Sequence, residues 1–185
     1  MRKNFGAKPF LYPQAVFIIG SYDENGNANA MNAAWGGVAD ADKIFICISK
    51  HKTTDNILAR KAFTVSMGTA DKVVACDYVG IVSANNEPDK MKKAGFTTVK
   101  SEFVDAPIIK ELPLTFECKL ISYDTENDYM FGEIVNVSAD ESILGDNGNI
   151  DVAKLRPIIF DGANHAYHVI GEKVGNAFSD GAQLK

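Results

Sequence analysis

The residues best suited to chemistry gather in the segment Ser49–Asn56, whose sequence is SKHKTTDN. The first backbone N–H groups of a helix have no intrahelical partner and carry partial positive charge, so a helix that begins in this segment suits an anion. Lys50, Lys52 and the nearby hydroxyl groups would add charge-assisted hydrogen bonds to a phosphate. Taken alone, however, the segment favours a capped surface helix with solvated lysines.

A second unusual stretch, Asn27–Gly37 (NANAMNAAWGG), surrounds the only tryptophan of the chain, Trp35, with small residues. Asparagine and glycine are poor helix formers, so an ordinary helix is not expected here. Small side chains let another group approach the backbone closely, and asparagine offers both a donor and an acceptor. Two interpretations stay open: a seat for a flat ligand, or a turn at a strand edge from which Trp35 packs into the core.

A third candidate is the stretch Val82–Gly95 (VSANNEPDKMKKAG), which begins with a polar turn. The backbone around Ser83–Asn86 is exposed in such a turn, and Lys90 would reach an electron-rich heterocycle or a phosphate. The alternative for Lys90 is a solvated helix face, as in most KMKK sequences.

Catalysis by protein groups alone has no visible apparatus in this sequence. His165 and His168 lie three residues apart, which in a strand places them on opposite faces, so we expect no metal site. The cysteines, Cys47, Cys76 and Cys118, are odd in number and widely spaced, so we expect no disulfide framework. No nucleophile-elbow, P-loop or dinucleotide-binding glycine motif occurs. We therefore expect any chemistry to be carried by a bound cofactor.

The whole chain has the composition of one globular domain spanning residues 1–185, with 46% hydrophobic and 23% charged residues. Its formal net charge of −5 disfavours nucleic-acid binding, because phosphate backbones are repelled by an acidic surface. No apolar run approaches the ~20 residues of a membrane span, and prolines interrupt any signal-like start. We expect a cytoplasmic protein without a membrane partner.

Strand patterns dominate the elements that must position these residues, and short helices lie between them. The predicted strands form a hairpin over residues 14–35 with its turn at Asn25–Gly26, a strand over 43–49, a strand over 63–68, a long hairpin over 114–140 and two segments within 157–171. A loop that enters a short helix is predicted over 50–62, with Thr53 or Thr54 as the N-cap of the helix. Further helices are predicted over 69–80, 86–95 and part of 146–157. Strict alternation of strand and helix is absent, which favours a mainly β (α+β) fold, an antiparallel barrel with peripheral helices.

Together these stretches resemble the flavin reductase-like, FMN-binding split-barrel family, and within it the flavoredoxin branch. The resemblance runs from Pro13 to Phe178 and includes NANAMNAAWGG, SKHKTTDNI, MFGEIVNV, KLRPIIF and IGEKVGNAF. It implies a six-stranded antiparallel split β-barrel that forms a homodimer and binds one FMN per protomer near the subunit interface. It also implies an oxidoreductase that moves electrons from NAD(P)H or a small redox protein to a flavin or redox acceptor. An FMN electron-transfer protein without nicotinamide turnover, or a flavin-binding module without turnover, stays open.

The resemblance also implies a set of FMN-binding residues. The flavin ring and ribityl chain would lie against one stretch, the phosphate at the strand-to-helix turn, and the polar edge of the ring near the next loop. The ring and ribityl chain would contact Asn29, Ala30, Met31, Ala33 and Trp35. The phosphate would contact Ser49, Lys50, His51 and Thr54. The polar edge of the ring would lie near Ser83, Ala84 and Asn85, with Lys90 and Phe160 also near the flavin. The family often carries a histidine before its MFxGEI strand, where this chain has Asn127, Asp128 and Tyr129.

Overall fold

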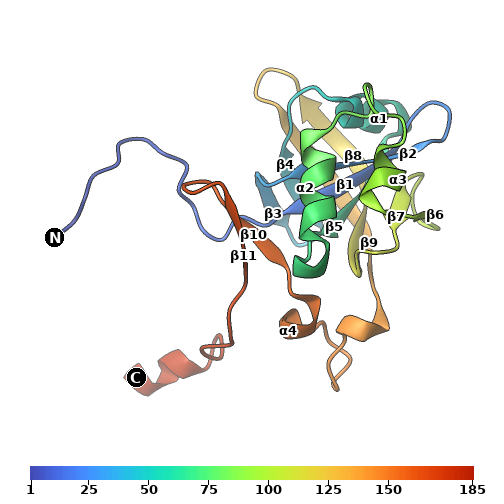
Figure 1. Cartoon of the computed structure of the whole chain (residues 1–185). Helices are drawn as coiled ribbons and strands as arrows, with labels where there is room; N and C mark the ends of the chain where they lie inside the picture. Colours follow the sequence, from blue (N-terminus) through green and yellow to red (C-terminus); the bar gives the residue numbers. More distant parts are fainter.

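The computed structural model describes all 185 residues, and its centre is a curled antiparallel sheet of seven strands (Figure 1). The order across the sheet is β2-β1-β5-β8-β9-β4-β3. These strands are β1 (Phe17–Tyr22), β2 (Ala28–Ala33), β3 (Gly36–Asp40), β4 (Lys43–Cys47), β5 (Ala62–Met67), β8 (Leu114–Asp124) and β9 (Tyr129–Ala139). The mainly β fold with short peripheral helices is confirmed.

The sheet closes on itself to form a split barrel. β2 and β3 are the two edges of the sheet, yet only Ala34 and Trp35 separate them along the chain. Two intervening residues span at most about 11 Å between the flanking Cα atoms. The edges therefore meet beside Trp35, and the sheet must curl.

The predicted count of six strands is corrected to seven in the main sheet. The additional strand is β3, whose sequence GGVAD has little β propensity and gave no strand pattern. It forms because its backbone pairs with β4, with Gly36 opposite Ile46. A tertiary pairing thus overrides a weak local preference.

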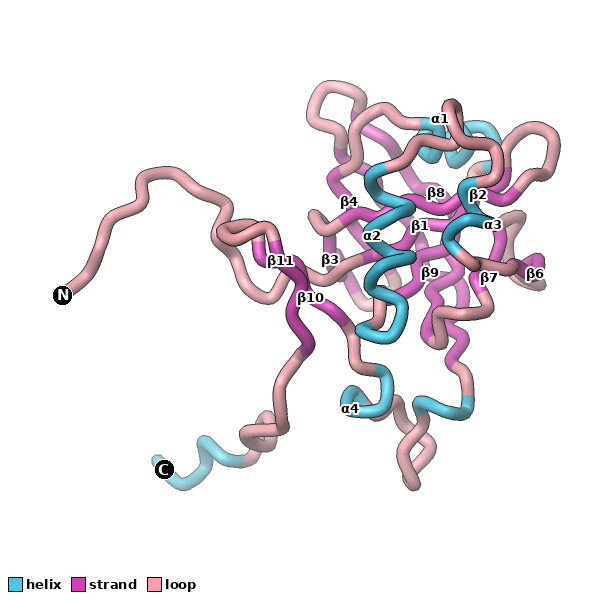
Figure 2. Tube along the Cα trace, viewed as in Figure 1, coloured by secondary structure: helices cyan, strands magenta, loops and turns pink.

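Two small sheets and the helices lie outside the barrel, as Figure 2 shows. The small sheets are β10 (Ile158–Asp161) with β11 (Ala166–Val169), and β6 (Thr98–Lys100) with β7 (Pro107–Ile109). The helices are α1 (Lys52–Arg60), α2 (Val73–Ile81), α3 (Lys90–Ala94) and α4 (Val152–Leu155), with 3-10 turns at Ala70–Lys72, Glu141–Ile143 and Asp180–Leu184. None of the helices has both the length and the apolar character needed to span a bilayer.

The core has two layers because β1 is covered on both of its faces. Phe17 and Ile19 pack inside the barrel with Phe63, whereas Ile18 packs outward with Val79 of α2. A strand buried on both sides reads as a continuous apolar run, which is the FIIG sequence of β1. The outer layer fixes α2 against the barrel, beside the edge strand β2.

The hairpin between β1 and β2 turns at the predicted place. Gly26 adopts a φ of +83°, which glycine tolerates without steric cost. The carboxylate of Asp23 accepts hydrogen bonds from the backbone N–H groups of Asn25 at 2.9 Å and of Asn27 at 2.8 Å. The loop is longer than a two-residue turn, since the first strand pair outside it joins Tyr22 to Ala28.

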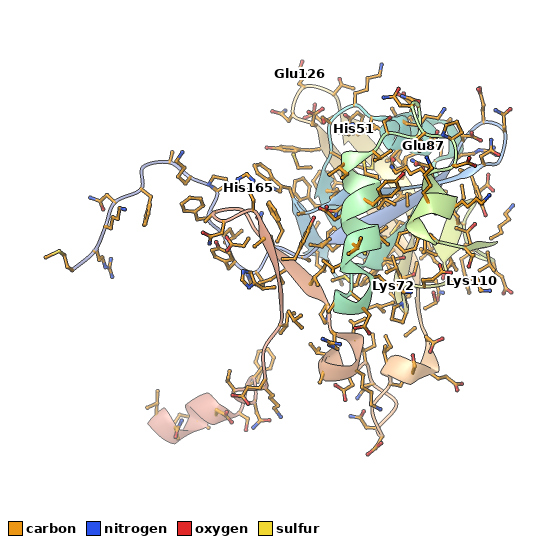
Figure 3. The ribbon with its side chains drawn as sticks, viewed as in Figure 1. His51, Lys72, Glu87, Lys110, Glu126 and His165 are labelled. Carbon is orange, nitrogen blue, oxygen red and sulfur yellow. The ribbon has the colours of Figure 1, made fainter.

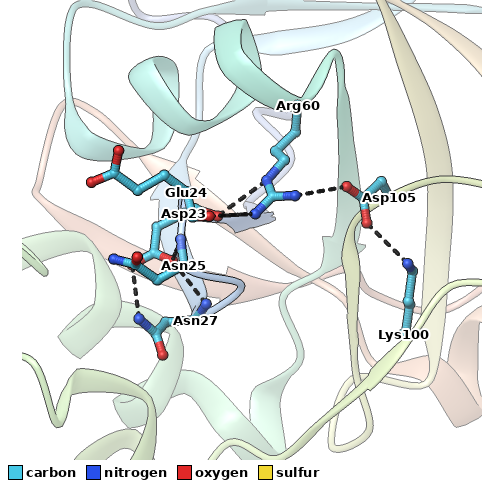
Figure 4. Close-up of polar contacts among 7 residues, drawn as sticks. All are labelled: Asp23, Glu24, Asn25, Asn27, Arg60, Lys100 and Asp105. Atoms are coloured by element: carbon cyan, nitrogen blue, oxygen red, sulfur yellow. Dashed lines mark hydrogen bonds and ion pairs between the residues drawn. The ribbon is translucent and has the colours of Figure 1, made fainter.

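An ionic network ties this hairpin to α1, as Figure 4 shows. Arg60, the last residue of α1, donates from Nε to the backbone oxygen of Asp23 at 3.1 Å and from Nη1 to Asp105 at 3.2 Å. Lys100 pairs with the other oxygen of Asp105 at 3.1 Å. The contacts hold the end of α1 beside the start of β2, so these two elements keep a fixed relation.

The ends of two helices differ from the sequence-based prediction. α1 begins two or three residues earlier than predicted, because its N-cap is His51 rather than Thr53 or Thr54. Thr54 instead lies one turn in, where its hydroxyl donates to the backbone oxygen of Ser49 at 2.7 Å and accepts from the N–H of His51 at 3.3 Å. The helix predicted over 86–95 shrinks to α3, but Gly95 ends it with a φ of +69°.

Candidate functional site

A cavity of about 450 Å³ opens along the free edge of β2. This volume lies within the ~300–1,000 Å³ that is usual for small-molecule sites. The lining residues come from β2, the start of α1, the end of α2 and the loop after it: Asn29, Met31, Asn32, His51, Lys52, Thr53, Val79, Gly80, Ile81, Val82, Ser83, Ala84 and Lys90. In Figure 3, His51 and Glu87 mark this end of the molecule.

The start of α1 forms one wall of the cavity through His51, Lys52 and Thr53. The first backbone N–H groups of this nine-residue helix have no intrahelical acceptor, and their dipoles favour a negative charge. Lys52 adds a formal positive charge beside them. Ser49 steadies the turn, since its hydroxyl lies 3.1 Å from Nε2 of His51. This wall has the chemistry of an anion site.

Asn29 brings an unsatisfied acceptor to the same place. Its side chain is only 5% exposed, and its Nδ2 donates to the hydroxyl of Thr53 at 2.8 Å. Its Oδ1 is the only buried side-chain nitrogen or oxygen of the chain without a hydrogen-bond partner. Buried polar groups nearly always have hydrogen-bond partners, and a buried group without one lowers the stability of the fold by about 1–3 kcal/mol. The cavity thus contains an acceptor that a ligand hydroxyl or N–H would satisfy.

Lys90 contributes a buried positive charge without a counter-charge. The side chain is 4% exposed, so it does not lie on a solvated helix face. Burial lowers the pKa of Lys90 from its ordinary 10.5 to about 8, with no compensating charge. The nearby carboxylate of Glu87 is already paired with Lys93, which lowers the pKa of that carboxyl group. An ammonium group in this position is stabilised by an anionic or electron-rich ligand.

The C-terminal end of α2 brings hydrogen-bond acceptors with partial negative charge to the cavity, in contrast to the positive groups at α1 and Lys90. The last carbonyl groups of a helix have no intrahelical donors, and Val79, Gly80 and Ile81 line the cavity where α2 ends. A Cβ atom at Gly80 would lie 2.9 Å from Cβ of Asn32, so only glycine lets α2 approach β2 this closely. The cavity therefore joins a positive end at α1 and Lys90 to an acceptor-rich end at α2.

Asn32 anchors α2 to the edge strand. Its Nδ2 donates to the backbone oxygen of Cys76 at 3.0 Å and lies 3.5 Å from the hydroxyl of Tyr167. That hydroxyl in turn donates to Asp77 at 2.8 Å. Burial and this carboxylate raise the pKa of Tyr167 to about 12, so the phenol stays protonated and keeps donating. The chain of bonds fixes the cavity wall.

Six of the residues predicted to bind FMN line this cavity. They are Asn29, Met31, His51, Ser83, Ala84 and Lys90. They come from four separate parts of the chain, so the fold brings together residues that the sequence only suggested as a group. Their role towards FMN stays a prediction.

The other predicted residues lie around the cavity or away from it. Ser49, Lys50 and Asn85 belong to the turns beside the cavity, whereas Thr54 is fully buried in the first turn of α1. Ala30 packs in the outer core layer with Val79, whereas Ala33 packs inside the barrel with Phe17. Phe160 lies in β10, where its ring is tilted by 54° against that of Tyr167 at a centroid distance of 6.1 Å.

Trp35 lines a different groove, on the β3 side of the barrel. Its side chain is 51% exposed, so the interpretation that it packs into the core is wrong. The groove measures about 420 Å³ and is also lined by Phe45, Cys47 and Tyr129. Tyr129, one of the three residues where the family often carries a histidine, packs edge-on against Phe45 at a ring-centroid distance of 5.3 Å. Within one protomer, Trp35 and Tyr129 therefore do not line the cavity at β2.

Sequence reasoning missed the wall made by Asn32 and the end of α2. α2 has only one charged residue, Asp77, and its apolar residues are not confined to one side, a pattern that predicts a buried helix and hides any ligand-facing side. The one usable signal was Gly80, a glycine inside a helical pattern, which often marks a close approach. Lys52 was predicted as a possible phosphate contact and Thr53 as a candidate N-cap, but neither was among the residues assigned to FMN.

No group of three or more His, Cys, Asp or Glu side chains lies close enough to hold a metal ion. His168 lies 3.5 Å from Asp161, an ion pair only when the imidazole is protonated, and His165 lies in the β10–β11 turn. Cys118 is fully buried, and burial raises the pKa of its thiol to about 12, consistent with a core side chain.

Comparison with known proteins identifies the family. Residues 10–160 match the family described as "Flavin reductase like domain". The flavoredoxin of Desulfovibrio vulgaris (Miyazaki F) is 38% identical, with a TM-score of 0.93 over 98% of this chain and all of that one. The flavoredoxin of Methanosarcina acetivorans is 25% identical, with a TM-score of 0.90 over the whole of both chains.

Sequence comparison also finds an uncharacterized protein of Aquifex aeolicus that is 34% identical to this chain over 122 residues. The match covers 65% of this chain and 62% of that protein, so less than two thirds of its length is spanned. The family match covers most of the chain, and it includes the edge strand, the start of α1 and the loop after α2 that form the cavity. The chain therefore belongs to the flavin reductase-like domain family.

Proposed function

We propose that this protein is an FMN-dependent oxidoreductase of the flavin reductase and flavoredoxin type. Its cofactor is FMN, in agreement with the family and with FMN-binding proteins of the same fold from Shewanella baltica and Thermus thermophilus. Bound FMN supplies the redox chemistry, accepting electrons from a reduced donor and passing them to an acceptor. The donor in this proposal is NAD(P)H or a small redox protein, and the acceptor is a flavin or a second redox protein.

The observation that carries the proposal is the set of unsatisfied groups in the β2 cavity. Asn29 has a buried acceptor without a donor, and Lys90 has a buried ammonium group without a counter-charge. FMN offers what both lack: hydroxyl groups on its ribityl chain, and a phosphate and an electron-rich ring. The backbone N–H groups of Lys52 and Thr53, at the start of α1, suit the phosphate.

Each wall of the cavity then has a separate task. The start of α1, with Lys52 and Thr53, holds the phosphate. Asn29 orients the ribityl chain by accepting a hydrogen bond from one of its hydroxyl groups. Lys90 stabilises negative charge on the bound group, because an ammonium in a site of low dielectric interacts strongly with an anion. The carbonyl groups that end α2 accept hydrogen bonds from N–H groups of the ligand.

The functional unit in this proposal is a homodimer, as the resemblance to the family implies. A second copy would limit the access of water to a cavity that is open in a single protomer. The groove at Trp35 is a separate, more apolar surface that this proposal leaves free for contact with a partner or a donor.

A visible absorption spectrum of the freshly purified protein, followed by FMN titration of the stripped protein, tests the cofactor. We expect two flavin bands in the near-ultraviolet and blue, and saturable binding that the variant Asn29→Ala weakens. The donor is tested by anaerobic mixing of the FMN-loaded protein with NADH or NADPH. Bleaching of the blue band supports a nicotinamide donor, whereas bleaching only by a reduced redox protein favours electron transfer without nicotinamide turnover. Failure of the protein to bind FMN would overturn the proposal.

A further inference from the structure

The two ends of the chain form arms that run away from the barrel on the same side (Figure 1). Residues 1–13 and 168–185 are exposed along their whole length. The N-terminal arm is fixed where it leaves, because the backbone N–H of Phe160 donates to the oxygen of Gln14 at 2.8 Å and the hydroxyl of Tyr12 donates to Asp161. An arm fixed at its base and directed away from its own barrel is placed to reach another molecule.

The C-terminal arm, Gly171–Lys185, has its own local fold but no hydrogen bond to the barrel. The carboxylate of Asp180 accepts from the backbone N–H of Asn176 at 2.8 Å, which closes a tight turn. The turn places Phe178 at a φ of +61°, an uncommon conformation for a bulky residue. Its ring is fully exposed, and the side chains of Val174 and Leu184 are also almost fully exposed. A preformed turn thus presents three apolar side chains that pack against nothing.

A matching apolar surface lies on α2, beside the base of this arm. Val74 is 80% exposed and Ile81 is 74% exposed, and with Tyr78 they follow a spacing of four and three residues along one side of the helix. We call these three residues the α2 stripe. The C-terminal arm starts next to it, since Tyr167 of β11 donates to Asp77 of α2 at 2.8 Å.

We propose that two copies of this chain exchange their C-terminal arms, each packing Val174, Phe178 and Leu184 on the α2 stripe of the other copy. Such contacts are self-complementary under a twofold axis, since the same two surfaces meet twice. The inference builds on the homodimer of the proposed function, but not on its cofactor.

Charge also favours a second copy as the partner. The N-terminal arm carries Arg2, Lys3 and Lys8 and no acidic residue, so the formal net charge of −5 divides into +3 on residues 1–13 and −8 on the rest. Two acidic barrels repel each other, and a basic arm that crosses from one to the other offsets that repulsion. Each copy provides both the basic arm and the acidic surface that it complements.

The exchange would also affect the β2 cavity. Ile81 belongs to the α2 stripe and lines the cavity as well. The arm of the partner copy would therefore end at the rim of the cavity and form part of its wall. This explains why the cavity is open in one protomer.

Light scattering during size-exclusion chromatography of the full-length protein tests the exchange. We expect the wild type to have about twice the chain mass of 20.1 kDa. Phe178→Glu on the arm and Val74→Glu on the stripe should each raise the dimer dissociation constant by roughly 100-fold or more, because every dimer buries two copies of each side chain. Val99→Glu in β6, an equally polar change at an exposed valine on the opposite side of the barrel, should have no effect.

Mixing the two weakened variants identifies the contact itself. A mixed dimer of Phe178→Glu with Val74→Glu keeps one intact pair, the wild-type arm on the wild-type stripe, so it should form more tightly than either parent. Absence of this complementation overturns the pairing of arm and α2. A wild type that is monomeric overturns both the homodimer and the exchange, whereas a Phe178→Glu variant that stays fully dimeric overturns the exchange alone. Unchanged circular dichroism verifies that the variants fold.

Discussion

Replacing Lys90 by methionine should change stability and FMN binding in opposite directions. Methionine keeps the length and apolar stem of the side chain but removes the buried charge. In the protein without FMN, that charge is a cost: a pKa lowered from 10.5 to about 8 corresponds to about 3 kcal/mol of lost solvation. Removing it should raise the melting temperature by roughly 6–12 °C for a chain of this size.

The stability gained by Lys90→Met should depend on pH between about pH 8 and 10.5. Below about pH 8, Lys90 is protonated in both the folded and the unfolded chain, so the wild type bears the full cost. Between about 8 and 10.5 the unfolded chain keeps a proton that the folded chain has released, so the stability of the wild type rises with pH. The difference between Lys90→Met and wild type should therefore shrink steadily across this window.

Whereas Lys90→Met should make the protein without FMN more stable, it should weaken FMN binding. A hydrogen bond to a charged group contributes about 1.5–3 kcal/mol, so Lys90→Met should weaken FMN binding by roughly 10- to 150-fold at pH 7. Thermal melts without FMN and fluorescence titrations with FMN measure the two effects on the same samples. Lys92→Met, at an exposed lysine of the same helix, is the control and should change neither. A Lys90→Met protein that is less stable than the wild type and binds FMN equally well would refute the reasoning, since Lys90 would then be a packing residue.

Three further substitutions probe the remaining walls of the cavity. Asn29→Ala removes the orphaned acceptor, so it should weaken both FMN and riboflavin by about 0.5–1.5 kcal/mol in titrations; an effect on FMN alone would place Asn29 at the phosphate instead. Lys52→Met should weaken FMN more than riboflavin, because only FMN carries the phosphate, and equal losses would exclude Lys52 from that role. Gly80→Ala forces a Cβ to within 2.9 Å of Cβ of Asn32, so denaturant unfolding should show a loss of about 1–3 kcal/mol together with weaker FMN binding. If Gly80→Ala unfolded at the same denaturant concentration as the wild type, α2 and β2 would not be tightly packed at this position.

Local patterns were sufficient for most of the architecture. The apolar run of β1, the alternation and β-branched residues of β8 and β9, the turn signal at Asn25–Gly26 and the final glycine of α3, Gly95, are local features. Each acts over a few residues, so each can be predicted from the sequence. The anion-binding chemistry of the turn before α1 is local as well, because a helix start with lysines and hydroxyl groups has the same character in any fold.

The exact composition of the site depended on contacts between distant parts of the chain. β3 exists because β4 pairs with it, and the edges of the sheet meet at Trp35 only because the whole sheet curls. That curl turns Trp35 to the β3 groove rather than to the β2 cavity.

Sequence by itself thus determined the family, the class of fold and the type of chemistry at the start of α1. Only the tertiary structure decided which side chains share the cavity, because burial is a property of the assembled elements. Lys90 reads as a solvated lysine in KMKK and becomes a buried ammonium group once α3 packs beside β2 and the end of α2. Asn29 likewise becomes an orphaned acceptor only when Thr53, 24 residues away, engages the other end of its amide. Whether a side chain is solvated or hydrogen-bonded depends on its neighbours in space, and local sequence patterns do not predict which distant residues those neighbours are.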